Sequence, residues 1–398
     1  MLVYRKSLTF IVLAMFYGLI TCHLNQEKDE MDNAVHKEED AKKVIVFASH
    51  EDYLGVRASD YKSVSVKLPD GNDPFPKLSD YGFFKGPIQY LFPSEGVIPY
   101  ALNSELFTDY AYKSRFVWMP EQSAATYNKD HVLDFPNRAV LIKNFYYPSD
   151  MRNPYGERRL LETRLLIKTE SGWKNYPYLW NDAQTEASYH PFGEFIDVAW
   201  IDEQGLAKST NYMQPQQGQC KSCHIVGNEV MPIGPKVRNL NGLFDYGEEG
   251  LQNQLLYWQK VGYLEGFNPN EQQPRNAVWN DPSEDLDDRA RAYLDINCGH
   301  CHNPNGPGNT TGFYLDALTA DPKELGVCKV PVAAGRGSGN LSYDIVPGNP
   351  VKSILHYRMA SDEIDIMMPE IGRSMIHYEG LDLIASWIAS MEETSCAE

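Results

Sequence analysis

The chain contains the pentapeptide Cys-x-x-Cys-His twice. Two thiols at this spacing can add to the two vinyl groups of a haem, while the histidine that follows ligates the iron from below. The pattern therefore predicts two covalently bound haem c groups. We expect them on Cys220, Cys223, His224, Cys298, Cys301 and His302.

Other chemistry open to paired cysteines fits the pattern less well. Two Cys-x-x-Cys pairs can bind one zinc ion, but here each pair is followed at once by a histidine. A dithiol redox motif would follow a strand in a thioredoxin-like unit, whereas a predicted helix leads into Cys298. His300 lies between two haem-binding cysteines, on the wrong side to ligate the same iron. Haem attachment therefore explains both motifs best.

Around the second motif, the chain is similar to class I cytochrome c. A predicted helix over 281–297, the motif, a loop, Met367-Met368-Pro369 and a closing helix follow in the order of that family. The resemblance implies that Met368 is the sixth ligand of the iron bound by His302. Met367 is the main alternative.

The first motif has less regular surroundings. Gly234-Pro235 follows His224 at the class I spacing, and in that family the proline carbonyl orients the histidine. No helix is predicted before Cys220, so we expect the β-rich domain to supply the missing wall. An open or exchangeable sixth position is one alternative for this iron. Met231 lies only seven residues beyond His224, so we expect it on the proximal side. Candidate distal ligands without a motif are Met213, His190 and Met359.

An export signal is predicted at residues 1–22. The apolar run from Leu8 to Ile20 is too short for a comfortable membrane span. The end of this run resembles a lipobox, which implies lipidation of Cys22. The charged stretch over 23–45 is typical of a flexible tether. We therefore expect an exported protein, periplasmic or anchored at the outer membrane, that meets the membrane through its lipid alone.

Two cysteines remain after the signal and the two motifs are accounted for. They are Cys328 and Cys396. In an oxidising compartment this pair can form a disulfide that holds the C-terminal tail, and two free thiols are the alternative. We predict the disulfide.

Strand-like runs alternate with turn residues over 79–212, which predicts a β-rich domain. Segments 213–280 and 281–398 are expected to be an irregular first haem module and a class I-like second one. The predicted fold class is α+β multidomain, with a β-rich N-terminal domain followed by mainly α cytochrome c-like haem modules. The predicted strands are 139–147, 161–169, 173–180 and 195–202.

Three amphipathic helices are predicted after Cys220. The middle helix is predicted to begin at Asp281, which can cap it. Two further signals favour this start, since Pro282 suits the first helical position and Glu284 can complete a capping box. The apolar positions of the other two are Leu251, Leu255, Trp258, Leu381, Ile384, Ile388 and Met391.

Residues from about 80 to 396 together resemble a family of mostly uncharacterised bacterial diheme c-type cytochromes. The resemblance implies a β-rich N-terminal domain, a C-terminal cytochrome region and two haems. It also points to a parallel β-helix protein as a partner, because such a protein is often encoded beside members of the family. The matching segments are Gly96-Val-Ile-Pro-Tyr100, Leu106-Phe-Thr-Asp109, Glu162-Thr-Arg164, Trp180-Asn181, Gly234-Pro-Lys-Val-Arg-Asn-Leu-Asn241, Asn297-Cys-Gly-His-Cys-His-Asn-Pro304, Val346-Pro-Gly-Asn-Pro350 and Met367-Met-Pro-Glu-Ile-Gly-Arg-Ser374.

The charge balance excludes one class of partner. Against 36 basic residues stand 54 acidic ones, a formal net charge of -18, so nucleic acid is not expected to bind. We expect redox partner proteins instead, with electrons passing between them through the two haems.

Two alternatives to electron transfer stay open. A diheme peroxidase-like enzyme would need one haem with an open face and a nearby acid or base. A haem-bearing module that binds carbohydrate or protein would use exposed aromatics, for which Trp173, Tyr176 and Trp180 are candidates. No catalytic residue is assigned.

Overall fold

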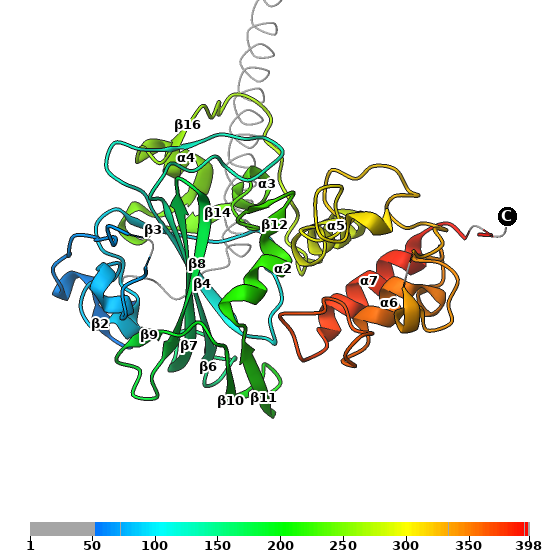
Figure 1. Cartoon of the computed structure of the whole chain (residues 1–398), viewed down its shortest axis with the longest axis horizontal. Helices are drawn as coiled ribbons and strands as arrows, with labels where there is room; N and C mark the ends of the chain where they lie inside the picture. Colours follow the sequence, from blue (N-terminus) through cyan, green and yellow to red (C-terminus); the bar gives the residue numbers. More distant parts are fainter. Residues whose placement is uncertain (1–51, 72, 333, 394, 397–398) are drawn as a thin grey trace, which may run out of the picture. The chain divides into compact units, whose positions relative to one another are not determined.

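An antiparallel sheet of six strands organises the β-rich part of the chain. The computed structural model describes residues 52–71, 73–332, 334–393 and 395–396. The strands lie in the spatial order β3-β4-β6-β7-β8-β9 (Figure 1). Their bounds are β3 Val97–Tyr100, β4 Tyr112–Trp118, β6 Val140–Pro148, β7 Arg158–Thr169, β8 Gly172–Trp180 and β9 Ala187–Tyr189.

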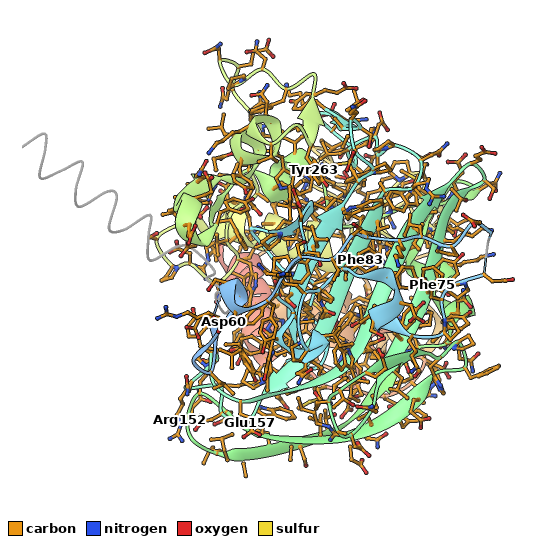
Figure 2. All side chains as sticks on the ribbon, turned by 90° about the vertical axis from the view of Figure 1, so that its left-hand side faces the viewer. Asp60, Phe75, Phe83, Arg152, Glu157 and Tyr263 are labelled. Carbon is orange, nitrogen blue, oxygen red and sulfur yellow. A yellow bond between two sulfur atoms is a disulfide. The ribbon has the colours of Figure 1, made fainter. Side chains whose placement is uncertain are left out.

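The first face of this sheet is covered by the preceding chain. Successive residues of a strand point to opposite faces, and Val140 and Ile142 of β6 point to this one. They are fully buried in a core with Phe83, on which Phe75 also packs through Tyr81. Figure 2 shows Phe75 and Phe83 on this side of the sheet. The first face is therefore the main apolar core of the β-rich region.

The second face is only partly covered. Phe145 and Tyr147 of β6 pack against the hairpin of β10 (Glu194–Ile201) and β11 (Ala207–Gln214). The Tyr147 ring lies 4.8 Å from that of Trp200 on this hairpin. Because the hairpin covers one end of the face, the other end of the same strands is left to line a cleft.

The remaining regular elements are short. Four pairs of small strands are β1 Asp52–Tyr53 with β2 Val56–Arg57, β12 Ile225–Val226 with β13 Glu229–Val230, β14 Leu243–Asp245 with β15 Leu251–Asn253, and β16 Leu264–Glu265 with β5 Ala125–Thr126. The α-helices among the described residues are α2 Cys220–His224, α3 Val237–Leu240, α4 Gln254–Lys260, α5 Leu286–Asn297, α6 Ile354–Met359 and α7 Tyr378–Ser390, of which α5 and α7 are the longest.

The predicted fold class is wrong in its C-terminal half. Strands and irregular segments dominate the described residues, and only α5 and α7 exceed seven residues among the helices there, so the region after 213 does not consist of mainly α cytochrome c-like modules. The physical reason lies in composition. Glycine and proline interrupt the segments 304–312 and 331–350, and both residues disfavour helix interiors.

Helices α5 and α7 form the core of the C-terminal region. Leu294 of α5 and Ile384 of α7 are fully buried in one cluster with Leu355 of α6. The start of α5 differs from the prediction, because Asp285 caps it by accepting from the backbone N–H groups of residues 287 and 288. Asp281 instead caps a separate turn, in which it accepts from the backbone and hydroxyl of Ser283. The helix is therefore one turn shorter than expected.

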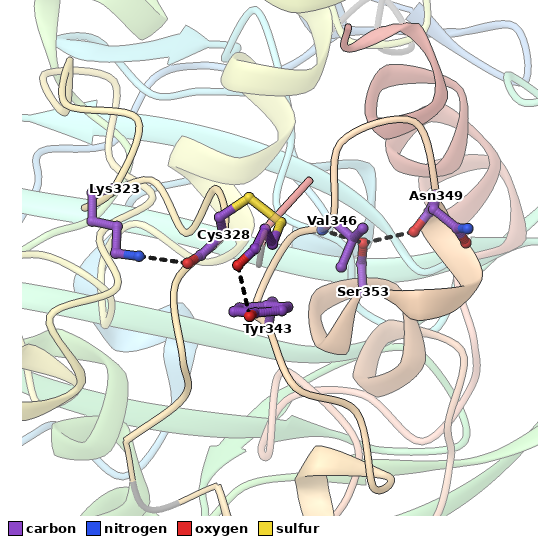
Figure 3. Close-up of a disulfide and its surroundings, with 7 residues drawn as sticks. Lys323, Cys328, Tyr343, Val346, Asn349 and Ser353 are labelled. Carbon is purple, nitrogen blue, oxygen red and sulfur yellow. Dashed lines mark hydrogen bonds between the residues drawn. A yellow bond between two sulfur atoms is a disulfide. The ribbon is translucent and has the colours of Figure 1, made fainter. Parts of the chain in front are cut away.

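The predicted disulfide between Cys328 and Cys396 is present. The sulfur atoms lie 2.02 Å apart and the Cα atoms 5.0 Å apart (Figure 3). The Tyr343 hydroxyl donates to the Cys396 carbonyl at 2.7 Å, and Lys323 donates to the Cys328 carbonyl. These contacts hold the end of the chain against the loop before α6.

The N-terminal predictions lie outside the described residues. They are the export signal at 1–22, the tether at 23–45 and lipidation of Cys22. Described residues from 52 onward belong to one compact unit. No helix within them is long and apolar enough to cross a membrane.

Candidate cofactor site

The two Cys-x-x-Cys-His motifs are built on different local structures. The first is itself the short helix α2, which a 3-10 turn over Gln217–Gln219 leads into. The second follows α5, where Cys298 is the C-cap and donates its N–H to the Leu294 carbonyl at 2.9 Å. All four motif cysteines are free and partly buried. Their thiols are thus available for thioether bonds.

The motifs meet in space although they are far apart in sequence. The ligand atoms of Cys223, His300 and Cys301 lie within 4.8 Å of one another. The Cys301 thiol also donates to the Ser222 carbonyl at 3.8 Å. Farther along, the Gly227 N–H donates to the Asn305 carbonyl at 2.8 Å. Groups attached at the two motifs would therefore start from adjoining sulfur atoms.

Each motif histidine is oriented by a backbone carbonyl. His224 Nδ1 lies 2.8 Å from the Met231 carbonyl, and His302 Nδ1 lies 3.1 Å from the Phe313 carbonyl. A hydrogen bond at Nδ1 leaves Nε2 as the ring atom for a metal. Burial lowers the pKa of both histidines to about 4, so the imidazoles are neutral at pH 7. Neutral imidazole is the form that ligates iron.

The predicted role of the Pro235 carbonyl is wrong. It accepts from the Leu133 N–H at 3.1 Å instead of orienting His224. The hairpin of β12 and β13 turns the chain back directly after α2, and this brings the Met231 carbonyl to the histidine ring. The nearer carbonyl therefore replaces the one that class I spacing implied.

A cleft lies between the sheet and the two motifs. We call it the cofactor cleft. Cys220, Cys223 and His224 of the first motif and Cys298 and His300 of the second line it. Apolar wall residues include Leu102, Leu141, Leu166, Ile233 and Ile296.

Met368 lines the cofactor cleft, and Met367 is not among the lining residues. The Arg373 guanidinium fixes its backbone, since Nε and Nη2 donate to the Met368 carbonyl at 3.1 and 2.8 Å. The cleft reaches the second motif at Cys298 and His300, while Cys301 and His302 are not among its lining residues. Ligation of the His302 iron by Met368 stays a prediction.

The segment carrying Met368 is held by a segment far away in the chain. The Asp109 carboxylate accepts from the backbone N–H groups of Ser374 and Met375 at 2.7 and 2.8 Å. The Phe107 ring stacks on His377 with centroids 4.1 Å apart. These contacts join two segments that carry the family resemblance, and they give both a positioning role at the cleft.

The methionines and the histidine considered as ligands of the predicted first haem differ in whether they line the cleft. Met359 lines the cofactor cleft, but it belongs to the α6 and α7 core. His190 contacts the Gly193 carbonyl at 3.1 Å and does not line the cleft. Met213 on β11 and Met231 do not line it either.

A row of basic side chains on the second sheet face was missed by the sequence reasoning. Arg115 on β4 pairs in register with Lys143 on β6, and Lys143 pairs with Arg164 on β7. All three line the cofactor cleft. Lys143 stands out in the sequence because it interrupts a mostly apolar strand. The row itself cannot be predicted from the sequence, because it depends on how β4, β6 and β7 pair.

A buried ion pair links the chain after the first motif to the helix before the second. Arg238 donates to the Asp295 carboxylate through Nε at 3.0 Å and Nη2 at 2.9 Å. Burial would raise the pKa of Asp295, but Lys236 and Arg238 outweigh it and hold that pKa well below its usual range. The pair therefore fixes α5 relative to the segment around 238.

The aromatic residues considered for carbohydrate binding are buried. Trp173, Tyr176 and Trp180 expose 5%, 6% and 5% of their surface. They pack within the sheet core and offer no exposed stacking surface.

Comparison with protein-family models, with curated proteins and with solved structures finds no match to this chain. The functional argument therefore rests on the chain's own residues.

Proposed function

We propose that the chain is a diheme c-type cytochrome that transfers electrons between extracytoplasmic redox partners. The observation that carries the proposal is that the two Cys-x-x-Cys-His motifs adjoin at Cys223 and Cys301, and that both contribute residues to one mostly apolar cleft. Haem supplies reversible one-electron redox chemistry when it is bound. Cys220, Cys223, Cys298 and Cys301 would hold two such groups as thioethers.

The protein's own part is to orient and bury the ligands. The Met231 and Phe313 carbonyls fix the two imidazoles with Nε2 available. The apolar walls keep water away, which tunes redox potential together with the axial ligands. Because the motifs adjoin at Cys223 and Cys301, the placement favours rapid electron exchange between the two sites.

Export and partners belong to the same proposal. A lipidated Cys22 would hold the folded part at the periplasmic or outer membrane surface by a single anchor. The net charge of -18 favours redox partners that present a basic surface, because opposite charges steer association. A parallel β-helix protein is the one partner that the family resemblance offers.

One other function has an observation in its favour. Cys223, His300 and Cys301 are close enough to hold a metal ion without haem, and His300 Nδ1 has no hydrogen-bond partner within the described structure. A structural zinc site takes four ligands in tetrahedral geometry. Cys220 and Cys298 are not part of this group, so the two cysteine pairs do not form a four-thiolate site.

Redox-poised optical spectroscopy tests the proposal. The full-length chain, made in a bacterium that has the c-type maturation machinery, should show a reversible haem spectrum that titrates in two one-electron steps. Steady consumption of hydrogen peroxide by the reduced protein would contradict electron transfer and support a peroxidase-type enzyme. A colourless protein that contains zinc by elemental analysis would contradict haem attachment.

A further inference from the structure

Lys143 is the central member of the basic row in the cofactor cleft. Its neighbours in register are Arg115 and Arg164, and adjacent strands of a sheet lie about 4.8 Å apart. Glu105 accepts from the Arg115 guanidinium at 2.5 Å, and Glu162 from that of Arg164 at 2.5 Å. Each flanking cation therefore has its own carboxylate.

The Lys143 amine differs from both neighbours. Within the described part of the chain it has neither an ion pair nor a hydrogen bond, and the contact it does have is with the Phe145 ring at 4.7 Å. Burial and then the charge of Arg115 lower the pKa of Lys143 well below its ordinary value. An uncharged amine keeps a lone pair, which makes it a nitrogen ligand rather than a cation.

The position of Lys143 relative to the first motif supports the same role. Cys220 lies beside Arg164 and Asn175, on β7 and β8. Lys143 stands on the next strand of the sheet, β6, and lines the same cleft as Cys220 and His224. The amine and the first motif thus share one cleft.

The distal ligands that the sequence offers for the first iron suit it less well than Lys143 does. His190, Met213 and Met231 do not line the cleft, and Met359 belongs to the C-terminal helical core. Met368 lies in the segment that resembles the class I methionine loop of the second motif. His377 lines the cleft, but its ring is stacked on Phe107 and both ring nitrogens face other groups. Nδ1 lies 2.9 Å from the Tyr293 hydroxyl and Nε2 lies 3.7 Å from the Glu379 carboxylate.

We propose that the Lys143 amine is the sixth ligand of the iron bound by His224. The inference rests on the proposed function, since it needs a haem at the first motif. Two nitrogen ligands would close this iron to peroxide and hold its potential below that of a His/Met haem, because methionine raises the potential. The two haems would then differ in potential, with the first the better electron donor.

Lys143→Arg is the decisive variant. Arginine has a long basic side chain like lysine but is never deprotonated in proteins, so it cannot ligate iron. Electron paramagnetic resonance of the oxidised holoprotein should show that one of two low-spin haems changes its signal in Lys143→Arg. Lys113→Arg is the matched control, because Lys113 is buried on β4 of the same sheet but does not line the cleft. Its spectrum should equal that of the unchanged protein.

Labelling keeps the test independent of whether the variant folds. In the unchanged protein with 13C-labelled lysine, the reduced state should show side-chain signals of one lysine shifted far upfield by the haem ring current. Two attached haems with no shifted lysine signal, or an unchanged resonance spectrum in Lys143→Arg, would overturn the ligand assignment alone. A protein that attaches no haem would overturn the proposed function instead.

Discussion

At the scale of single residues, the sequence predicts the attachment chemistry but not the residues that surround the attachment sites. The thiol spacing and the following histidine are local, so Cys220 to His224 and Cys298 to His302 could be picked out directly. The carbonyls that orient the histidines could not, because the Met231 and Phe313 positions depend on how the following loops turn. The role of Lys143 could not be predicted either, because it depends on residues of the neighbouring strands.

Met368 carries the first prediction at this scale. Met368→Ala should abolish the weak absorption band at the red end of the visible spectrum that reports ligation of iron by sulfur. It should also lower the reduction potential of one haem, because methionine ligation raises that potential. Both haems should stay attached. Met367→Ala is the control, since Met367 does not line the cleft. If the band survives in Met368→Ala, another residue ligates that iron.

At the scale of elements, strands were predicted better than helix ends. The runs 161–169 and 173–180 are confirmed as parts of β7 and β8, and the runs 139–147 and 195–202 match β6 and β10 to within one residue at each end. Their alternating apolar residues fit a sheet with packed faces. The start of α5 was misplaced because Asp281 and Asp285 are both good caps. Local capping preference cannot choose between two such residues, whereas the core around Leu294 can.

The ion pair between Arg238 and Asp295 gives the prediction at this scale. Asp295→Asn should lower the free energy of unfolding by about 3–5 kcal/mol at pH 7, since it leaves a buried guanidinium without its charge partner. Denaturant titration followed by circular dichroism measures this. Asp182→Asn is the control, because Asp182 is 98% exposed beside Arg159 and such pairs contribute about 0–1 kcal/mol.

The same pair predicts a pH dependence. Because the folded-state pKa of Asp295 is lowered, its stabilisation is complete above the unfolded-state value of about 3.9 and is lost as the pH falls further. The stability gap between the unchanged protein and Asp295→Asn should therefore narrow below about pH 4. A gap that stays constant from pH 7 to pH 3 would contradict the role of this charge.

At the scale of the whole molecule, the sequence could not show that the two motifs adjoin. Their meeting at Cys223 and Cys301 is a long-range contact between α2 and the chain after α5. The expected α-helical modules were wrong because glycine and proline interrupt the chain after 304. The sheet does line the cleft beside the first motif, as expected. The folded unit is therefore shared between the β-rich part and both motifs.

The disulfide is a test of stability at this scale. Cys328 and Cys396 are separated by 68 residues, and the chain-entropy model gives about 4 kcal/mol for a loop of that size. The free energy of unfolding of the double variant Cys328→Ser with Cys396→Ser should be lower by about this amount. Denaturant titration measures the difference. The optical haem spectrum of the variant should not change, since neither cysteine lines the cofactor cleft. Loss of a haem in this variant would contradict the view that the disulfide stabilises the fold without taking part in cofactor attachment.

Mass spectrometry of the intact, acid-extracted protein tests the central claim most directly, because thioether-bound haem survives that extraction. The holoprotein should carry two added haem masses. Replacing Cys220 and Cys223 together by serine should leave one, and replacing Cys298 and Cys301 together should leave the other. An unchanged holoprotein that retains no haem mass, although it was made with the c-type maturation machinery, would contradict the account.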